Sequence, residues 1–141
     1  MSGEGGPPRE ALIPIHEASA VGRVRRVVAA AMAEIGASKI EMTRMVTAAS
    51  ELARNTLTHG GGGEVRVAVV GPGNRRKVEV TFVDQGPGIA DVALAMTDGY
   101  STGGGLGLGL SGAKRLCKEF HIRSEPGRGT TVRVASWMER R

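Results

Sequence analysis

Asp84 is a residue whose side chain and sequence surroundings suit it to bind a ligand. It ends a segment of alternating apolar residues, and glycines follow it at positions 86 and 88. Farther along lies a glycine loop, Gly103-Gly104-Gly105-Leu106-Gly107-Leu108-Gly109-Leu110. Glycine lets backbone N–H groups approach a ligand closely, and a helix beginning near Gly107 or Gly109 would add the positive end of its dipole. The pattern predicts a nucleotide held by a carboxylate at one end and by a glycine loop at the other.

The glycine loop can be compared with two phosphate-binding signatures. A Walker A loop requires Gly-Lys-Ser/Thr, whereas the sequence from Gly112 reads Gly-Ala-Lys. Gly107-x-Gly109-x-x-Gly112 matches the dinucleotide fingerprint, but that fingerprint must directly follow a strand, and residues 100–103 have no strand pattern. Taken alone, the loop also fits a flexible linker that binds nothing.

Glu51 and Asn55 form a second candidate pair on a predicted helix. Ser38 is expected to cap this helix, which ends at the glycines of residues 60–63. Its apolar stripe follows the helical period, with Met42, Met45, Val46, Ala49, Leu52, Ala53 and Thr56. Glu51 and Asn55 fall on the opposite face. They are either ordinary surface residues or a carboxylate base beside an oxygen ligand for Mg²⁺. Periodicity favours the surface unless another element covers that face.

The rest of the chain supplies the elements that must position these residues. Ser19 is expected to cap a first helix that Gly36 ends, and residues 64–70 and 77–84 read as a β-hairpin. The other predicted elements are a strand over residues 11–15, a helical turn over 90–96, a helix after the glycine loop with Leu110, Ala113, Cys117 and Phe120 on one stripe, and strands over 120–124 and 130–137. This order predicts an α/β (α+β) two-layer sandwich, with helices covering one face of a mostly antiparallel mixed sheet. Residues 1–9 read as a disordered tail and residues 10–141 as a single domain.

Composition narrows the class of partner. The net charge is +5 and the pI is about 10.1, values that are typical of proteins that bind nucleic acid. The basic residues are scattered, however, and no aromatic platform accompanies them, so we expect no nucleic-acid partner. The single cysteine, Cys117, fits a reducing compartment. Without an apolar run long enough to span a bilayer, the sequence predicts a cytoplasmic protein with no membrane partner.

Four motifs occur in a fixed order along the chain. They are Glu51-Leu-Ala-Arg-Asn55-x-x-x-His59, Asp84-x-Gly86-x-Gly88, Gly105-x-Gly107-x-Gly109 and Gly127-x-Gly129-Thr130. Together they resemble the N, G1, G2 and G3 boxes of the GHKL ATPase superfamily, whose Bergerat fold occurs in gyrase, MutL and histidine kinases. The run from Asp98 to Leu110 looks most like the RsbT-type serine/threonine kinases of bacterial partner switching. Anti-sigma-factor kinases of the RsbW and SpoIIAB type are the close relatives.

The resemblance implies how a base would be held. Asp84 would accept a hydrogen bond from the adenine amino group. Gly86 and Gly88 would let the chain pass close to the base. Thr130 would form a hydrogen bond near the adenine through its hydroxyl.

The resemblance also implies a reacting end. Glu51 would take the proton from a substrate hydroxyl, and Asn55 would hold Mg²⁺ against the phosphates of ATP. No basic residue lies between Thr97 and Gly109, so Lys114 and Arg115, one turn later, are either contacts of the γ-phosphate or residues that face solvent. The lid and the phosphate loop would contribute Ser101, Thr102, Gly103, Gly104, Gly105, Leu106, Gly107, Leu108 and Gly109.

The implied function is that of an ATP-dependent serine/threonine protein kinase in a stressosome-type partner-switching pathway. Its substrate would be a serine or threonine of a STAS-domain antagonist protein, and it would switch toward a PP2C-type phosphatase. Two alternatives remain. One is an anti-sigma-factor kinase that sequesters a sigma factor, and the other is a nucleotide-gated binding module without transfer activity.

Overall fold

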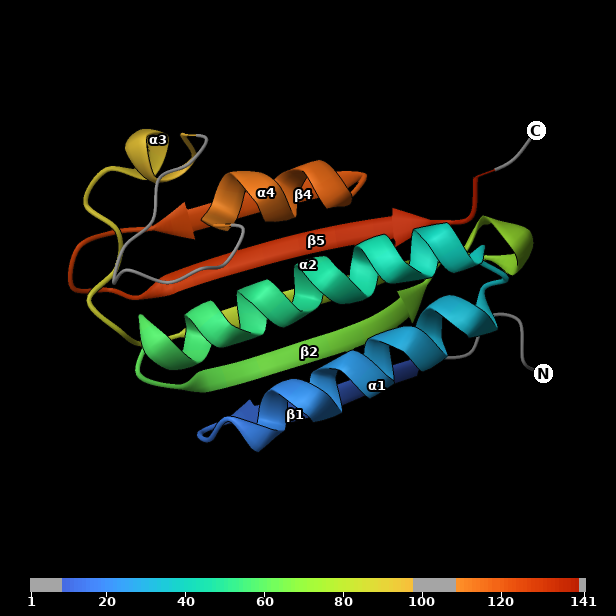
Figure 1. Ribbon diagram of the computed structural model, residues 1–141, viewed down its shortest axis with the longest axis horizontal. Coiled ribbons are helices and arrows are strands. Elements are labelled where there is room, and N and C mark those ends of the chain that lie inside the picture. Colours follow the sequence, from blue (N-terminus) through green and yellow to red (C-terminus); the bar gives the residue numbers. More distant parts are fainter. Residues whose placement is uncertain (1–8, 98–108, 140–141) are drawn as a thin grey trace.

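The protein is built in two layers, with the three longer helices on one face of a five-stranded sheet (Figure 1). The computed structural model describes residues 9–97 and 109–139. The elements in chain order are β1 (Arg9–Ile15), α1 (Ser19–Glu34), α2 (Lys39–Thr58), β2 (Gly63–Val70), the 3-10 turn η1 (Gly73–Arg75), β3 (Lys77–Asp84), α3 (Val92–Ala95), α4 (Gly109–Leu116), β4 (Glu119–Ser124) and β5 (Thr130–Trp137). The predicted two-layer sandwich is confirmed. Its first strand begins two residues earlier than expected.

The sheet has the order β1-β2-β3-β5-β4. Every strand pair among the described residues is antiparallel, so the expectation of a mixed sheet is wrong. The cause is that β4 turns back tightly into β5, which then lies beside β3 and runs opposite to it. The register places Asp84, the last residue of β3, between Gly63 of β2 and Thr130 of β5.

The core lies between the sheet and the helices. Alternate residues of the two hairpin strands are buried, as the hairpin pattern requires, namely Val65, Val67, Val69, Val78, Val80 and Phe82. Apolar residues at helical spacing along α1 and just after its end are buried as well, namely Val21, Val24, Val28, Ala31, Met32 and Ile35. Small β-branched and alanine side chains therefore let the helices lie close on the sheet.

The helix ends follow local chemistry, with one exception. The side chain of Ser38 accepts from the Glu41 N–H at 3.1 Å, and Glu41 returns a hydrogen bond to the Ser38 N–H at 2.8 Å, which forms a capping box. Gly36 ends α1 with φ at 82°. The predicted cap at Ser19 is wrong: Ala18 precedes the helix in a helical conformation, and the Ser19 hydroxyl donates to Glu17 at 3.0 Å instead.

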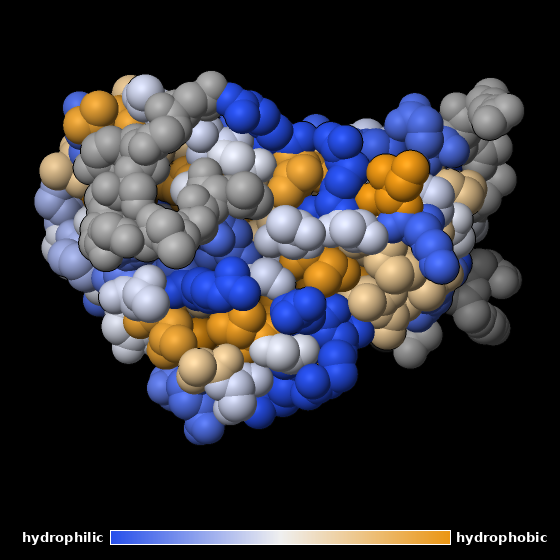
Figure 2. Space-filling model, in the orientation of Figure 1, coloured by the Kyte–Doolittle hydropathy of each residue, from blue (hydrophilic) through white to orange (hydrophobic). Residues whose placement is uncertain are grey.

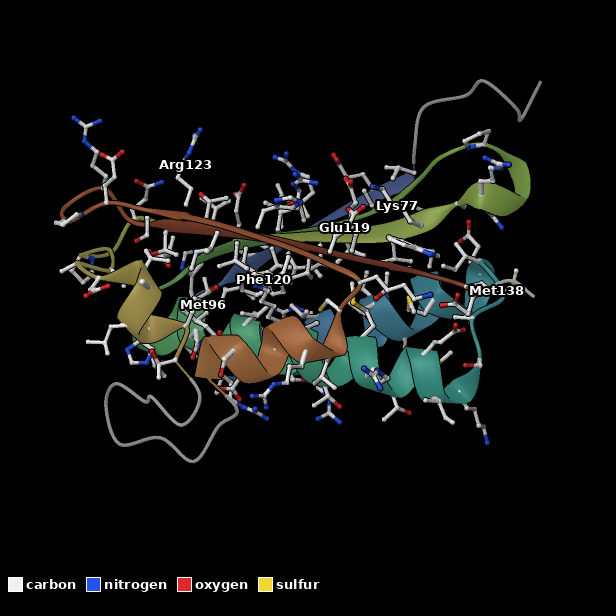
Figure 3. The ribbon with its side chains drawn as sticks, turned by 90° about the horizontal axis from the view of Figure 1, so that it is seen from above. Lys77, Met96, Glu119, Phe120, Arg123 and Met138 are labelled. Atoms are coloured by element: carbon white, nitrogen blue, oxygen red, sulfur yellow. The ribbon has the colours of Figure 1, made fainter. Side chains whose placement is uncertain are left out.

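Helix α4 is shorter than its apolar stripe suggested. It ends at Leu116, and Phe120 lies in β4, where it faces the helical layer (Figure 3). The sequence did not separate α4 from β4 here, because the helical period of α4 and the alternating period of β4 both place an apolar residue at position 120.

The other face of the sheet is covered by its own charged side chains. Lys77 contacts Glu119 at 3.2 Å and Glu79 at 3.4 Å, and Arg133 contacts Glu79 at 3.5 Å. Figure 3 shows Lys77 and Arg123 on this side, away from the helices. Over the helices the surface is mostly hydrophilic, with hydrophobic residues in separate spots (Figure 2). Within the described ranges, no helix is long and apolar enough to cross a membrane.

Candidate functional site

Asp84 is fixed by the backbone around it. Its Oδ1 accepts from the Gly86 N–H at 2.9 Å and from the Thr130 N–H at 3.2 Å. The first bond closes the turn after β3, and the second joins β3 to the start of β5. Its Oδ2 accepts no hydrogen bond from the described residues, and the side chain is only half-buried. One oxygen of the carboxylate is thus held by the protein and the other is available to a ligand.

Gly60 brings the end of α2 to this carboxylate. Its N–H donates to the Asn55 carbonyl at 3.2 Å, which closes the C-terminal end of the helix. A Cβ at position 60 would overlap the Asp84 side chain and would lie 2.6 Å from its Oδ2. On the other side, a Cβ on Gly86 would lie 2.7 Å from the Gly60 Cα. The N-box helix and the G1 turn therefore meet through two glycines.

The loop after Asp84 packs against the turn between β4 and β5. Gly88 has φ at 77°, and a Cβ there would collide with the Glu125 carbonyl oxygen. The Gly127 N–H donates to the Pro87 carbonyl at 2.7 Å. Gly86 and Gly88 were expected to allow close approach to a base. In the structure each allows close approach to another part of the backbone, which shapes the turn beneath Asp84.

Thr130 is paired with a residue that the motifs did not indicate. Its hydroxyl lies 2.7 Å from the Ser124 hydroxyl, which also accepts from the Ile89 N–H at 2.8 Å and donates to the Gly129 carbonyl at 3.1 Å. Ser124 and Thr130 face each other in the β4–β5 register. The sequence signal that could have revealed Ser124 is the hairpin itself, because directly opposed residues interact.

Glu51 is buried, which the helical period alone did not predict. Its exposed fraction is 8%, and its Oε1 lies 3.7 Å from Arg54 Nη1, a loose ion pair. Asn55, one turn later, is partly buried, and its side chain forms no hydrogen bond with the described residues. The interpretation of Glu51 as an ordinary surface residue is therefore wrong.

Helix α4 packs against α2. Arg44 donates to the Arg115 carbonyl at 3.1 Å, and the sulfur atoms of Cys117 and Met45 are 4.0 Å apart. These contacts join the C-terminal end of α4 to the first half of α2. Since the two helices run in opposite directions (Figure 1), the N-terminus of α4 points toward the half of α2 that carries Glu51.

Gly109 is the first residue of α4 and has φ at 73°. Ser111, in the first turn, is buried with an exposed fraction of 9%. Lys114 and Arg115 are exposed on the last turn. The other predicted residues of the lid and the phosphate loop lie outside the described residues, namely Ser101, Thr102, Gly103, Gly104, Gly105, Leu106, Gly107 and Leu108.

The arrangement can hold a polar ligand between three chain segments. Asp84 Oδ2 offers an acceptor, and the Asn55 amide offers an oxygen to a cation. The first N–H groups of α4 favour an anion, and helix α2, against which α4 packs, carries the buried carboxylate of Glu51. An amino-bearing base, an anionic group and a divalent cation match these three features, so a magnesium nucleotide fits the residues present.

Comparisons with known proteins agree with this geometry. Residues 41–140 match the family described as histidine kinase-, DNA gyrase B-, and HSP90-like ATPase. The chain is 41% identical over 105 residues to the serine/threonine-protein kinase RsbT of Bacillus subtilis, covering 74% of this chain and 79% of that protein. It is 30% identical over 120 residues to the anti-sigma F factor of Thermoanaerobacter sp., covering 81% of this chain and 82% of that protein.

A solved structure shares the fold. The RsbU and RsbW domains of Rv1364c from Mycobacterium tuberculosis align with a TM-score of 0.64 and 24% identity. The alignment covers 96% of this chain and 34% of that chain, so this protein spans about a third of it. At this identity the likeness supports the arrangement of strands and helices.

Proposed function

This chain belongs to the family of histidine kinase-, DNA gyrase B- and HSP90-like ATPases, on the branch of the RsbT-like kinases, and on that premise we propose that it is an ATP-dependent serine/threonine protein kinase. We place it in a bacterial partner-switching pathway, where its substrate is a serine or threonine of a small STAS-domain antagonist protein. The released kinase then switches toward a PP2C-type phosphatase.

Buried Glu51 is the observation that carries the kinase proposal. A carboxylate is costly to bury without hydrogen bonds, and among the residues that the structure describes Glu51 has only a loose ion pair with Arg54 at 3.7 Å. Nucleotide binding alone does not require such a group. A base that removes a proton from a hydroxyl needs this position, one helical turn before Asn55.

The residues divide the work between holding and reacting. Asp84 holds the adenine amino group through Oδ2, and Thr130 with Ser124 borders the base. Asn55 would hold Mg²⁺, which when bound neutralises phosphate charge. Glu51 orients the substrate hydroxyl and takes its proton. Phosphoryl transfer depends mainly on positioning and charge neutralisation, so a small set of residues suffices.

The anti-sigma F factors support a second candidate. Several proteins of that name are similar to this chain at 30–33% identity over most of its length. An anti-sigma-factor kinase would use the same pocket and would also sequester a sigma factor. A nucleotide-gated binding module would use the pocket without transfer.

Transfer of label from radioactive ATP separates these candidates. With Mg²⁺ and a co-encoded STAS-domain protein, the wild type should label a serine or threonine of that protein. Glu51→Gln should keep ADP binding and lose transfer by roughly a hundredfold or more. Glu64→Gln makes the same change on the open face of the sheet and should transfer at the wild-type rate.

Three outcomes would count against the proposal in different ways. Full transfer by Glu51→Gln would eliminate Glu51 as the base. Nucleotide binding without transfer to any STAS-domain protein would favour the binding module. Capture of a sigma factor together with transfer would favour the anti-sigma-factor kinase.

A further inference from the structure

We propose that Gly60 is a positioning residue for base recognition. Because it has no side chain, it leaves room for the Asp84 carboxylate to keep Oδ1 on the backbone and to offer Oδ2 alone to a base, and this selects adenine over guanine. The inference rests on the proposed function, because it presupposes that a nucleotide binds at Asp84.

The first support is the lack of space above Gly60. A Cβ at position 60 would overlap Cβ and Cγ of Asp84 and would lie 2.6 Å from Oδ2. A side chain at this position would push the carboxylate out of its present orientation. The Gly60 backbone lies outside the left-handed region, since its φ is not among the positive values. An alanine is therefore compatible with the backbone, and the conflict is with the Asp84 side chain.

The second support is that Gly60 is itself held in place. Its N–H bonds to Asn55 at 3.2 Å. A Cβ on Gly86 would lie 2.7 Å from the Gly60 Cα and 2.8 Å from its carbonyl oxygen. The end of α2 and the turn after β3 thus pack closely around Gly60, which leaves no room for a side chain between them and Asp84.

The third support is the hydrogen bonding of the two carboxylate oxygens. Oδ1 accepts two backbone N–H groups, from Gly86 at 2.9 Å and from Thr130 at 3.2 Å. A carboxylate oxygen has about two lone-pair sites, so Oδ1 is saturated. Since the two oxygens are chemically equivalent, either can face these N–H groups, but only the other one then remains for a base.

A single free acceptor matches adenine better than guanine. The adenine amino group presents one donor to a carboxylate from the edge of the ring. Guanine presents its N1–H and its amino group in parallel, and such a pair of donors is best satisfied by both oxygens of a carboxylate. With Oδ1 occupied, guanine would leave one donor unpaired, which disfavours it.

Gly60→Ala tests this role by calorimetry with ADP and GDP. The variant should bind ADP roughly ten- to a hundredfold more weakly, and its preference for ADP over GDP should fall toward unity. Because Gly60 acts through Asp84, the double variant with Asp84→Asn should bind ADP no more weakly than the weaker single variant. Gly22→Ala adds the same methyl group on α1, where its nearest neighbour is Arg26 Nη1 at 3.5 Å, and should change neither affinity.

The results separate this inference from the function on which it rests. A folded Gly60→Ala protein with the wild-type ADP preference would overturn the role of Gly60 and leave the kinase proposal standing. Failure of the wild type to bind ADP would overturn both. If Gly60→Ala does not fold, the wild type still decides: GDP, and ADP dimethylated at the amino group, should each bind at least roughly tenfold more weakly than ADP. Equal binding of GDP would overturn the inference.

Discussion

Asp84→Asn removes one charge and reverses the hydrogen bonding at one atom of the site. In the wild type, Oδ1 accepts two N–H groups and Oδ2 accepts none from the described residues. The asparagine can keep its oxygen toward Gly86 and Thr130, and its NH₂ then replaces Oδ2. That group donates, so it would face the donating amino group of adenine. In the opposite orientation the NH₂ would face two backbone N–H groups, which is worse.

The magnitude follows from the three hydrogen bonds that Asp84 can make. Bonds to a charged group contribute about 1.5–3 kcal/mol and neutral ones about 0.5–1.5 kcal/mol, so two weakened internal bonds cost about 2 kcal/mol of unfolding free energy. For a chain of 141 residues this corresponds to roughly 4–8 °C in Tm. Loss of the bond to adenine costs about 1.5–3 kcal/mol, or roughly ten- to a hundredfold in ADP affinity.

Calorimetric titration with ADP and thermal unfolding without ligand measure the two effects separately. Asp91→Asn is the matched control, since Asp91 caps α3 by accepting from the Leu94 N–H at 2.9 Å, and asparagine caps a helix equally well. It should leave ADP affinity and Tm unchanged. If Asp84→Asn binds ADP as tightly as the wild type, the carboxylate does not contact the base. A large fall in Tm with unchanged ADP affinity would make Asp84 a purely structural residue.

Three further predictions concern groups outside the pocket. The Ser38 amide, followed by the Glu139 amide, lowers the pKa of Glu41, so its stabilisation is complete above the ordinary glutamate pKa and is lost as pH falls through the lower folded value. Glu41→Gln should therefore lose about 1 kcal/mol at pH 7 in urea unfolding, and the loss should disappear in acid. Burial raises the pKa of Cys117 to about 12. At pH 8 the native thiol should therefore react with a disulfide reagent roughly a hundredfold or more slowly than the urea-unfolded thiol. Equal rates would contradict the burial of this thiol. Arg23→Glu with Arg26→Glu reverses two exposed charges on α1. If an acidic STAS-domain partner docks on this helix, the double variant should associate with it more slowly, in a salt-dependent way, while ADP affinity stays unchanged. An unchanged association rate in surface plasmon resonance would show that the partner does not dock at these arginines.

The sequence predicted most of the fold because its signals are local. Alternating valines predicted the hairpin, Gly36 predicted the end of the first helix, and Ser38 predicted the start of the second. The insertion of β5 between β3 and β4 was not predictable in this way, because strand order depends on contacts between distant segments. For the same reason, the sequence did not show that every strand pair is antiparallel.

The sequence predicted which motifs form the candidate site, but not how their residues contact one another in the fold. Periodicity put Glu51 on a polar face, whereas the folded chain buries that carboxylate, which depends on contacts with segments distant in the sequence. Gly60 and Ser124 were missed as site residues for a related reason. Each acts on a predicted residue from another element, Gly60 on Asp84 and Ser124 on Thr130. No property of a single residue could have indicated such a role.

Contacts just after the C-terminal end of α4 help to fix the position of this helix beside the candidate site. Helix α4 has eight residues and is therefore about 12 Å long, with Gly109 at the pocket. Just after its other end, Lys118 donates to the Trp137 carbonyl at 2.7 Å and forms an ion pair with Glu139 at 2.8 Å. Glu139 in turn donates its N–H to Glu41 at 2.7 Å, in the first turn of α2.

These contacts connect the end of β5, the junction between α4 and β4, and the start of α2. Because a helix of this length moves as a rigid rod, holding its C-terminal end restricts where its N-terminus can lie. Asp84, by contrast, is held at the opposite end of the sheet, by backbone from β3, β5 and α2. The proposed base-binding and anion-binding parts of the site are thus anchored at opposite ends of the same two elements, β5 and α2. A ligand that joins them must match a distance that the fold has already set, which favours an elongated ligand with a base at one end and phosphates at the other.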